Sequence, residues 1–258
     1  MNLEWAKKRK IIYGAITIII AILASIYFFR GILFPVQTCF DGKQNNFESG
    51  IDCGGTCSLR CSQEVIPLSV LWARPLATSS STYDFAALIS SKNIDNAPRT
   101  VAYTFIAYNK DAQEITRVQG TTTAPIDGDF PIIAQNIRLA QVPTTVSATI
   151  FSNVPHYTVL EKPTTPTLRI VSSRFEAGSI PRVYATIINT KRIELRNLPV
   201  RVLLYDADGN VFAAGQTIVP SLGKEGTKEV VFTWDKAFSI TPTRIRVFPI
   251  LDPFLGSL

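Results

Sequence analysis

The chain has 258 residues, of which 46% are hydrophobic and 18% charged, with four cysteines and one histidine. Its formal net charge of +6 comes in equal parts from the five charged residues before position 11 and from the rest of the sequence, where no comparable basic run occurs. This distribution argues against a nucleic-acid-binding protein, which needs a clustered basic face, and one histidine cannot build a metal triad.

Residues 11–33 are predicted to form a transmembrane helix, preceded by a basic cytoplasmic N-terminus at residues 1–10. The stretch from Ile11 to Phe29 has 19 residues without a charge and directly follows the run Lys7–Lys10. A helix rising about 1.5 Å per residue crosses a hydrocarbon core of about 30 Å in roughly 20 apolar residues. Because basic residues beside a first helix stay on the cytoplasmic side, we expect a single-pass protein of the cell membrane with its bulk extracytoplasmic.

A cleaved signal peptide is the alternative interpretation of this segment. Signal peptides have an apolar region of about 7–15 residues that ends in a small-x-small cleavage site. Here the apolar stretch is longer, and its C-terminal end, Ser25–Arg30, is bulky and aromatic instead of a small-x-small site. We therefore expect a retained signal anchor, with Trp5 at the inner membrane interface, where amphipathic rings are enriched.

All four cysteines fall within a predicted disulfide-rich module at residues 37–63. Their even number and extracytoplasmic position favour two disulfides. Zinc sites use cysteine pairs two to four residues apart in two separated knuckles, whereas thirteen residues separate Cys39 from Cys53 here. Three pairings are open. Our working choice is Cys39 with Cys57 and Cys53 with Cys61, because it ties both ends of the segment into one knot.

Four oxygen-bearing side chains lie within twelve residues of the module: Asp41, Asn45, Glu48 and Asp52. Calcium takes six to eight oxygen ligands, so this set suits a structural calcium ion, the one metal or cofactor that the sequence suggests. Asp and Asn also cap turns through their own backbone, and the spacing is not that of an EF-hand. Calcium binding and turn capping both remain open.

The segment from Cys39 to Cys61 resembles a small recurring module of exported bacterial and archaeal proteins, of the form CxDGxxNxxExGxDCGGxCxxxC. This chain matches every fixed position, including the glycines at 42, 50, 54 and 55. The resemblance covers this segment alone. It implies an exported location and a type of module, without an activity.

Beyond the module, apolar residues alternate with period two, as in Val200–Leu204, Val230–Trp234 and Ile245–Val247. Such alternation predicts half-buried antiparallel strands. Turn sequences recur between them, including Asp127–Asp129 and Asp208–Asn210. Many short strands with such turns are typical of sandwiches and barrels, so the predicted fold class is mainly β.

An internal repeat predicts two sandwiches, at residues 66–160 and 168–258. The strand-like sequence from Val101 is echoed from Val200, about one hundred residues later, which is the size of one immunoglobulin-like domain. Between the copies, residues 161–167 hold two prolines, which favour an extended and fairly stiff linker.

The sequence Asn197–Asn210, followed by Gly215, Pro220 and Gly226, resembles the FxLYD-type immunoglobulin-like domain of exported bacterial proteins. The first copy is a looser match, because its turn at residues 110–113 lacks the glycine. The resemblance implies immunoglobulin-like β-sandwiches used for assembly or recognition, with no catalytic residues.

A catalytic site is not expected. The single histidine, His156, lies between Pro155 and Tyr157, where we expect a surface or interdomain residue. The cysteines are predicted to be oxidised, and no glycine-rich phosphate loop occurs. Trp72 and Trp234 fall in strand-like stretches and are predicted core residues.

These features together predict a non-enzymatic, membrane-anchored envelope protein that presents two β-sandwiches for binding or scaffolding. The expected partners are the membrane and proteins of the cell envelope, with neither nucleic acid nor a small-molecule substrate. The alternative is a structural subunit of a larger envelope assembly, such as a secretion or pilus-type machine. The apolar tail at residues 248–258 is expected either to finish the last strand or to offer a docking segment.

Overall fold

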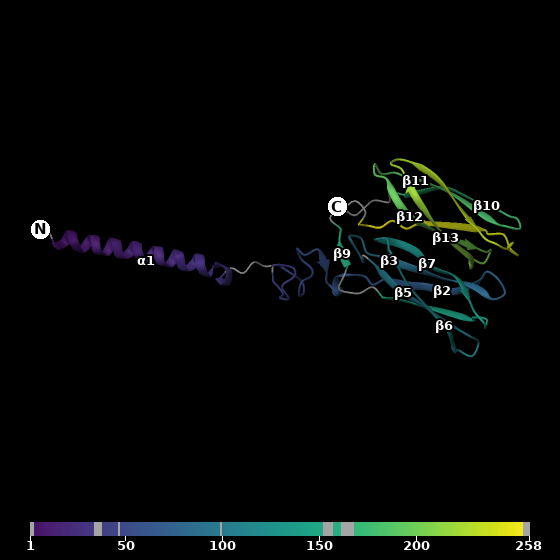
Figure 1. Ribbon diagram of the computed structural model, residues 1–258, viewed down its shortest axis with the longest axis horizontal. Helices are drawn as coiled ribbons and strands as arrows, with labels where there is room; N and C mark the ends of the chain where they lie inside the picture. The colour runs from purple at the N-terminus through teal and green to yellow at the C-terminus, as the bar shows by residue number, and fades with distance from the viewer. Residues whose placement is uncertain are drawn as a thin grey trace. The chain divides into compact units, whose positions relative to one another are not determined.

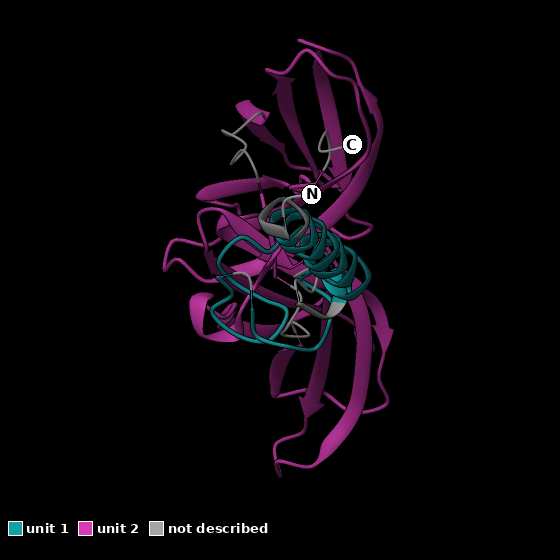
Figure 2. Ribbon diagram, turned by 90° about the vertical axis from the view of Figure 1, so that its left-hand side faces the viewer, with its two compact units in different colours: residues 1–57 teal, residues 58–258 magenta. Residues whose placement is uncertain are grey.

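The computed structural model describes residues 3–33, 38–45, 47–98, 100–151, 157–160 and 168–254. The chain divides into two compact units, residues 1–57 and 58–258, coloured separately in Figure 2. The fold is mainly β with one long N-terminal helix, as the sequence predicts (Figure 1). The predicted linker at 161–167 and His156 lie outside the described residues.

Helix α1 spans Leu3–Leu33, and its segment Lys7–Gly31 is long and apolar enough to cross a membrane. The side chains of that segment are exposed on every side of the helix. The helix begins earlier than residue 11 because Leu, Ala, Lys and Arg in the first turns are good helix formers. The side chain of Trp5 is outside the described part of the chain.

The first sandwich consists of two three-stranded antiparallel sheets. One has the order β2-β3-β7, formed by Ser69–Ala77, Thr82–Lys92 and Asp127–Arg138. The other has the order β6-β5-β8, formed by Glu114–Thr122, Val101–Tyr108 and Thr145–Phe151. Phe85, Phe105 and Phe130, which are fully buried, belong to the hydrophobic core of this copy.

The second sandwich repeats this topology strand for strand. Its sheets have the orders β10-β11-β14, formed by Leu168–Glu176, Arg182–Asn189 and Thr227–Thr233, and β13-β12-β15, formed by Val211–Leu222, Leu195–Tyr205 and Arg244–Pro249. Alternate residues of β11 and β12 form its core, including Val183, Ile187 and Val202. The internal repeat seen in the sequence is therefore a repeat of sheet order.

A fifth, small sheet joins the end of the cysteine segment to the first sandwich. It has the order β1-β9-β4, formed by Leu59–Arg60, Tyr157–Val159 and Asn96–Pro98, and the short 3-10 helix η1, Ser62–Glu64, follows β1. Arg60 also forms a 2.7 Å ion pair with Asp95. The boundary between the units therefore falls after Cys57, inside the predicted module 37–63.

The two sandwiches share a buried interface. Strand β12 is buried on both faces, because Val200, Val202 and Leu204 enter the core of its own sandwich while Leu203 and Tyr205 join the core cluster of the first. The four sheets consequently lie in layers, with β2-β3-β7 and β13-β12-β15 in the middle (Figure 1). This differs from the half-buried strands that the alternation predicts, since each middle sheet covers the outer face of the other.

Candidate functional site

The cysteine segment is fully oxidised. Cys39 and Cys57 form a disulfide with their Cα atoms 5.7 Å apart, which is one pair of the interlaced arrangement. Cys53 and Cys61 are disulfide-bonded as well, so none of the four cysteines is free. Because metal binding and nucleophilic attack both require a thiolate, these sulfur atoms serve neither role. The approach of Glu48 to the Cys39 and Cys57 sulfurs is thus not a thiolate metal site.

Two of the predicted calcium ligands, Asp41 and Asp52, accept hydrogen bonds from turn amides. The Oδ1 atom of Asp52 accepts from the backbone N–H groups of Asp41 and Gly42, at 2.9 and 3.1 Å. Asp41 accepts from the Lys43 backbone at 3.0 Å and from the Asn45 side-chain amide at 2.8 Å. The Asn45 hydrogen bond is the main reason that the pKa of Asp41 lies below its ordinary value. Both carboxylates therefore close turns.

Glu48 is the buried carboxylate of the module, with 7% of its surface exposed. Its Oε2 atom accepts hydrogen bonds from the backbone N–H groups of Asn45 and Asp52, at 3.1 and 3.3 Å. Its Oε1 atom lies 3.2 Å from the Cys57 sulfur. The structure thus brings all four predicted residues together. The three carboxylates accept from turn amides and the Asn45 side chain donates to Asp41, while calcium binding stays a prediction.

The second glycine of the Gly54-Gly55 pair has a steric reason. Gly55 has a φ of +57°, and a Cβ atom there would collide with the carbonyl oxygen of Phe47. Gly42 also has a positive φ, of +70°, but no atom lies within 4 Å of the place its Cβ would take. The module consequently needs glycine at 55 for space as well as for conformation.

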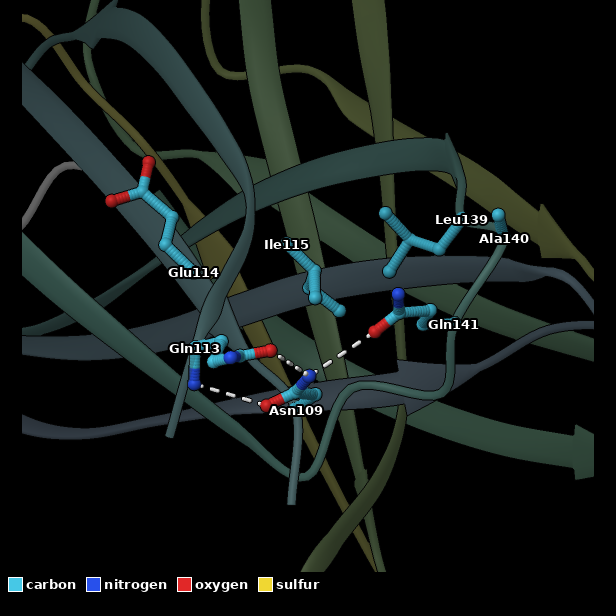
Figure 3. A pocket seen from close by; sticks show the side chains of 7 residues that line it. All are labelled: Asn109, Gln113, Glu114, Ile115, Leu139, Ala140 and Gln141. Carbon is cyan, nitrogen blue, oxygen red and sulfur yellow. Dashed lines mark hydrogen bonds between the residues drawn. The ribbon is translucent and has the colours of Figure 1, made fainter. Parts of the chain in front are cut away.

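A cavity of about 250 Å³ lies at the end of the first sandwich, where the β5–β6 and β7–β8 connections meet (Figure 3). Its seven lining residues are mostly amides and apolar groups: Asn109, Gln113, Glu114, Ile115, Leu139, Ala140 and Gln141. The Asn109 amide donates to the side-chain oxygens of Gln113 and Gln141, at 3.3 and 3.2 Å. These hydrogen bonds connect the β5–β6 loop to the β7–β8 loop. The lining residues do not include a base next to a nucleophile, so the cavity lacks the arrangement of a hydrolytic site.

Arg201 is a buried cation between the sandwiches, 8% exposed. Its guanidinium donates to the Pro131 carbonyl oxygen at 2.6 Å and to the Thr122 hydroxyl at 2.8 Å. Burial lowers the pKa of Arg201 to about 10, so it remains charged at neutral pH. Within the described ranges no carboxylate lies at ion-pair distance from it. Sequence reasoning missed this residue, although the apolar Leu203 and Tyr205 on its face of the strand were a signal.

Asp84 is a second buried charged residue that the sequence did not indicate, with 4% of its surface exposed. Its carboxylate accepts a 2.9 Å hydrogen bond from the backbone N–H of Asn136, which has a φ of +59° at a bulge of β7. Burial raises the pKa of Asp84 above its ordinary value and outweighs this hydrogen bond, which acts in the opposite direction. Asp84 therefore fixes an irregular strand.

The predicted core tryptophans and the tail pack onto the sandwiches. Trp72 and Trp234 are partly buried against the first and second core clusters, and the Trp234 indole donates to the Ala214 carbonyl oxygen at 3.0 Å. After β15, Ile250 is 3% exposed and Phe254 packs with the small cluster of Ala97, Ile126 and Leu160. The described part of the tail is thus packed and does not form an exposed docking segment; residues 255–258 lie outside it.

Comparison with known proteins gives little support for any assignment. No protein-family model and no curated protein matches the chain. Among solved structures, a transglutaminase of red sea bream is similar with a TM-score of 0.23 and 14% identity, over 76% of this chain and 29% of that one. A TM-score this low carries no argument about fold or activity.

Proposed function

We propose that this protein is a non-enzymatic, single-pass membrane protein that presents two immunoglobulin-like sandwiches outside the cytoplasmic membrane. Helix α1 is the observation that carries the proposal, because its segment Lys7–Gly31 includes 19 consecutive uncharged residues and has no buried side chain. A core helix of a globular protein would bury one face, whereas a helix that is apolar all round suits lipid. The run Lys7–Lys10 supports a cytoplasmic N-terminus.

Two further observations support an extracytoplasmic position and a recognition role. All four cysteines are oxidised, and disulfides persist outside the reducing cytosol. Each sandwich is built from two antiparallel sheets in the same order, which supports an immunoglobulin-like assignment. Since the sandwiches share a buried interface, they hold their outer surfaces in one fixed geometry, as scaffolding requires.

Protease accessibility tests the topology. In sealed cells or right-side-out vesicles, external protease should remove the sandwiches and leave α1 in the membrane. Inverted vesicles should protect them. Sandwiches that are cut only in inverted vesicles, or a soluble chain lacking α1, would contradict the proposal.

Crosslinking in intact membranes, followed by mass spectrometry, tests the role. A binding or scaffolding protein should crosslink through exposed residues of the sandwiches to proteins outside the membrane. The alternative, a subunit of a larger envelope assembly, instead predicts stable stoichiometric membrane partners that crosslink through α1. Activity lost on His156→Ala would contradict the non-enzymatic assignment.

A further inference from the structure

Residues 38–57 of the module contain three large apolar side chains, and all three are exposed to solvent. Between Thr38 and Cys57 the sequence has no others than Phe40, Phe47 and Ile51. Their exposed fractions are 75%, 90% and 63%. The interior is formed instead by the disulfide and the Glu48 carboxylate. Single exposed apolar residues are common, but here every large apolar side chain between Thr38 and Cys57 is exposed.

The backbone holds Phe47 in an unfavourable conformation. Its φ is +63°, in the left-handed region that is unfavourable for an L-residue and rare for bulky side chains. The conformation is fixed on both sides, because the Phe47 carbonyl occupies the space left by Gly55 and the next amide, of Glu48, donates to the Asn45 carbonyl oxygen at 2.8 Å. An exposed aromatic ring on a braced backbone is typical of a functional contact.

The chain length keeps these side chains near the bilayer. The apolar segment of α1 ends at Gly31, and Phe40 follows nine residues later. A fully extended chain covers at most about 3.6 Å per residue, so Phe40 lies within roughly 32 Å of the end of the span along any path. The nearest large apolar phase is therefore the membrane that α1 is proposed to cross.

We propose that Phe40, Phe47 and Ile51 insert into the outer-leaflet interface of that same bilayer, so that the module rests on the lipid surface. The proposal rests on the membrane anchoring proposed above. Aromatic and aliphatic side chains on a small rigid support bind at the boundary between headgroups and acyl chains.

The charge of the module identifies the lipid chemistry. Residues 38–57 carry three carboxylates, Asp41, Glu48 and Asp52, and one Lys, so their formal charge is −2. Attraction to anionic headgroups needs basic residues and weakens with salt. The contact should therefore be apolar, equally strong on phosphatidylcholine alone, and insensitive to ionic strength.

Depth-dependent quenching on the full chain tests the contact. The protein is reconstituted into phosphatidylcholine nanodiscs that contain lipids spin-labelled near the top of the acyl chain, which quench residues at the interface, together with lipids spin-labelled near its end, which quench residues at the bilayer centre. An environment-sensitive fluorescent amino acid replaces Phe47, or Ile19 within α1, or Ile218, which is exposed in the second sandwich. We expect strong quenching at positions 19 and 47 and several-fold weaker quenching at position 218.

The outcomes separate the two proposals. If position 19 is strongly quenched but position 47 is quenched as weakly as position 218, the lipid contact is wrong and the proposed membrane anchor stands. Absence of quenching at position 19 would overturn both. Intensified quenching at position 47 with anionic lipid, lost in high salt, would overturn the apolar contact in favour of headgroup attraction.

A set of variants controls for the label itself. With the fluorescent residue at the exposed position 43, the combined change Phe40→Ser, Phe47→Ser and Ile51→Ser should abolish quenching. The matched change Ile218→Ser should leave it unaltered. Correct disulfides, checked by mass spectrometry of non-reduced peptides, exclude misfolding of the module. Quenching at position 43 that survives the triple change in a correctly paired protein would overturn the proposal.

Discussion

Arg201 in the second sandwich donates a 2.6 Å hydrogen bond to the main-chain carbonyl oxygen of Pro131 in the first. The two residues are 70 positions apart in the chain, and both lie in strands that are buried on two faces. Because the interface also contains Leu203 and Phe248, the hydrogen bond orients two sheets that hydrophobic burial already holds together.

Replacing Arg201 with Ala should destabilise the protein by about 2–4 kcal/mol, because two charge-assisted hydrogen bonds are lost and a buried carbonyl is left unpaired. Calorimetry should show one transition for the native protein and a broadened or divided one for the variant. Arg196→Ala is the matched control in the same strand, since the Arg196 side chain is 74% exposed. Similar effects of the two variants would contradict a special role for Arg201.

Asp84→Asn should stabilise the protein at pH 7. The raised pKa of Asp84 means that the folded chain keeps its proton to higher pH than the unfolded chain does. Stability is therefore greatest below the ordinary value of 3.8 and falls as pH rises through the folded pKa. Asn keeps the acceptor for the Asn136 amide and does not titrate.

Urea unfolding of Asp84→Asn between pH 3 and 7 checks this sign. The advantage of the variant should vanish at low pH. Asp95→Asn is a control of opposite sign, because hydrogen bonds from Asn96 and then Arg60 lower the pKa of Asp95. That variant should be less stable at neutral pH, and its deficit should vanish as pH falls. A pH-independent difference for Asp84→Asn would refute the argument.

Gly55→Ala should impair formation of the Cys39–Cys57 disulfide. The added methyl group meets the Phe47 carbonyl, so the turn must open. Gly42→Ala has a similar backbone conformation but open space, and should lose only about 1 kcal/mol. Peptide mapping of refolded, non-reduced protein measures the correctly paired fraction. An equal yield for the two variants would show that steric room at position 55 is unimportant.

Adding EDTA to the oxidised protein should leave the unfolding midpoint of the module unchanged, because its carboxylates stabilise turn amides directly. Glu48→Ala should lower the midpoint, since two amides lose their acceptor at about 1–3 kcal/mol each when buried. Glu48→Gln keeps one acceptor oxygen, so its unfolding midpoint should lie between those of the native protein and Glu48→Ala. A midpoint that falls with EDTA and recovers with calcium would instead support the calcium interpretation.

Local patterns in the sequence predicted the local structure well. The uncharged stretch from Ile11 predicted the helix, and the alternation at Val200–Leu204 predicted strand β12. Fixed spacing in the cysteine segment indicated turn-capping residues, because Asp and Asn make short-range hydrogen bonds. Which amide each carboxylate accepts from depends on turn geometry, and this was not predictable from residue types.

The sequence did not predict that one sandwich packs on the other. Alternation shows which face of a strand is apolar, and it placed Arg201 on the face expected to be solvated. The contact of Arg201 with Pro131 depends on how two whole sheets meet, which no short window of sequence contains. The same reason hid Asp84, whose partner Asn136 lies 52 residues away.

The shared interface joins unlike sheets. The first copy contributes β2-β3-β7, whereas the second contributes β13-β12-β15, which is the counterpart of β6-β5-β8. In such a heterologous contact each sandwich uses a different sheet, so the other sheet of each sandwich remains uncovered. A further sandwich of the same kind could in principle pack on either outer sheet by the same type of contact. The outer face of β10-β11-β14 instead carries the ion pairs Arg174–Glu229 and Arg182–Glu176, both well exposed. Charges on a solvated face disfavour dry sheet packing, so this outer face is unsuited to a second contact of the kind that joins the two sandwiches.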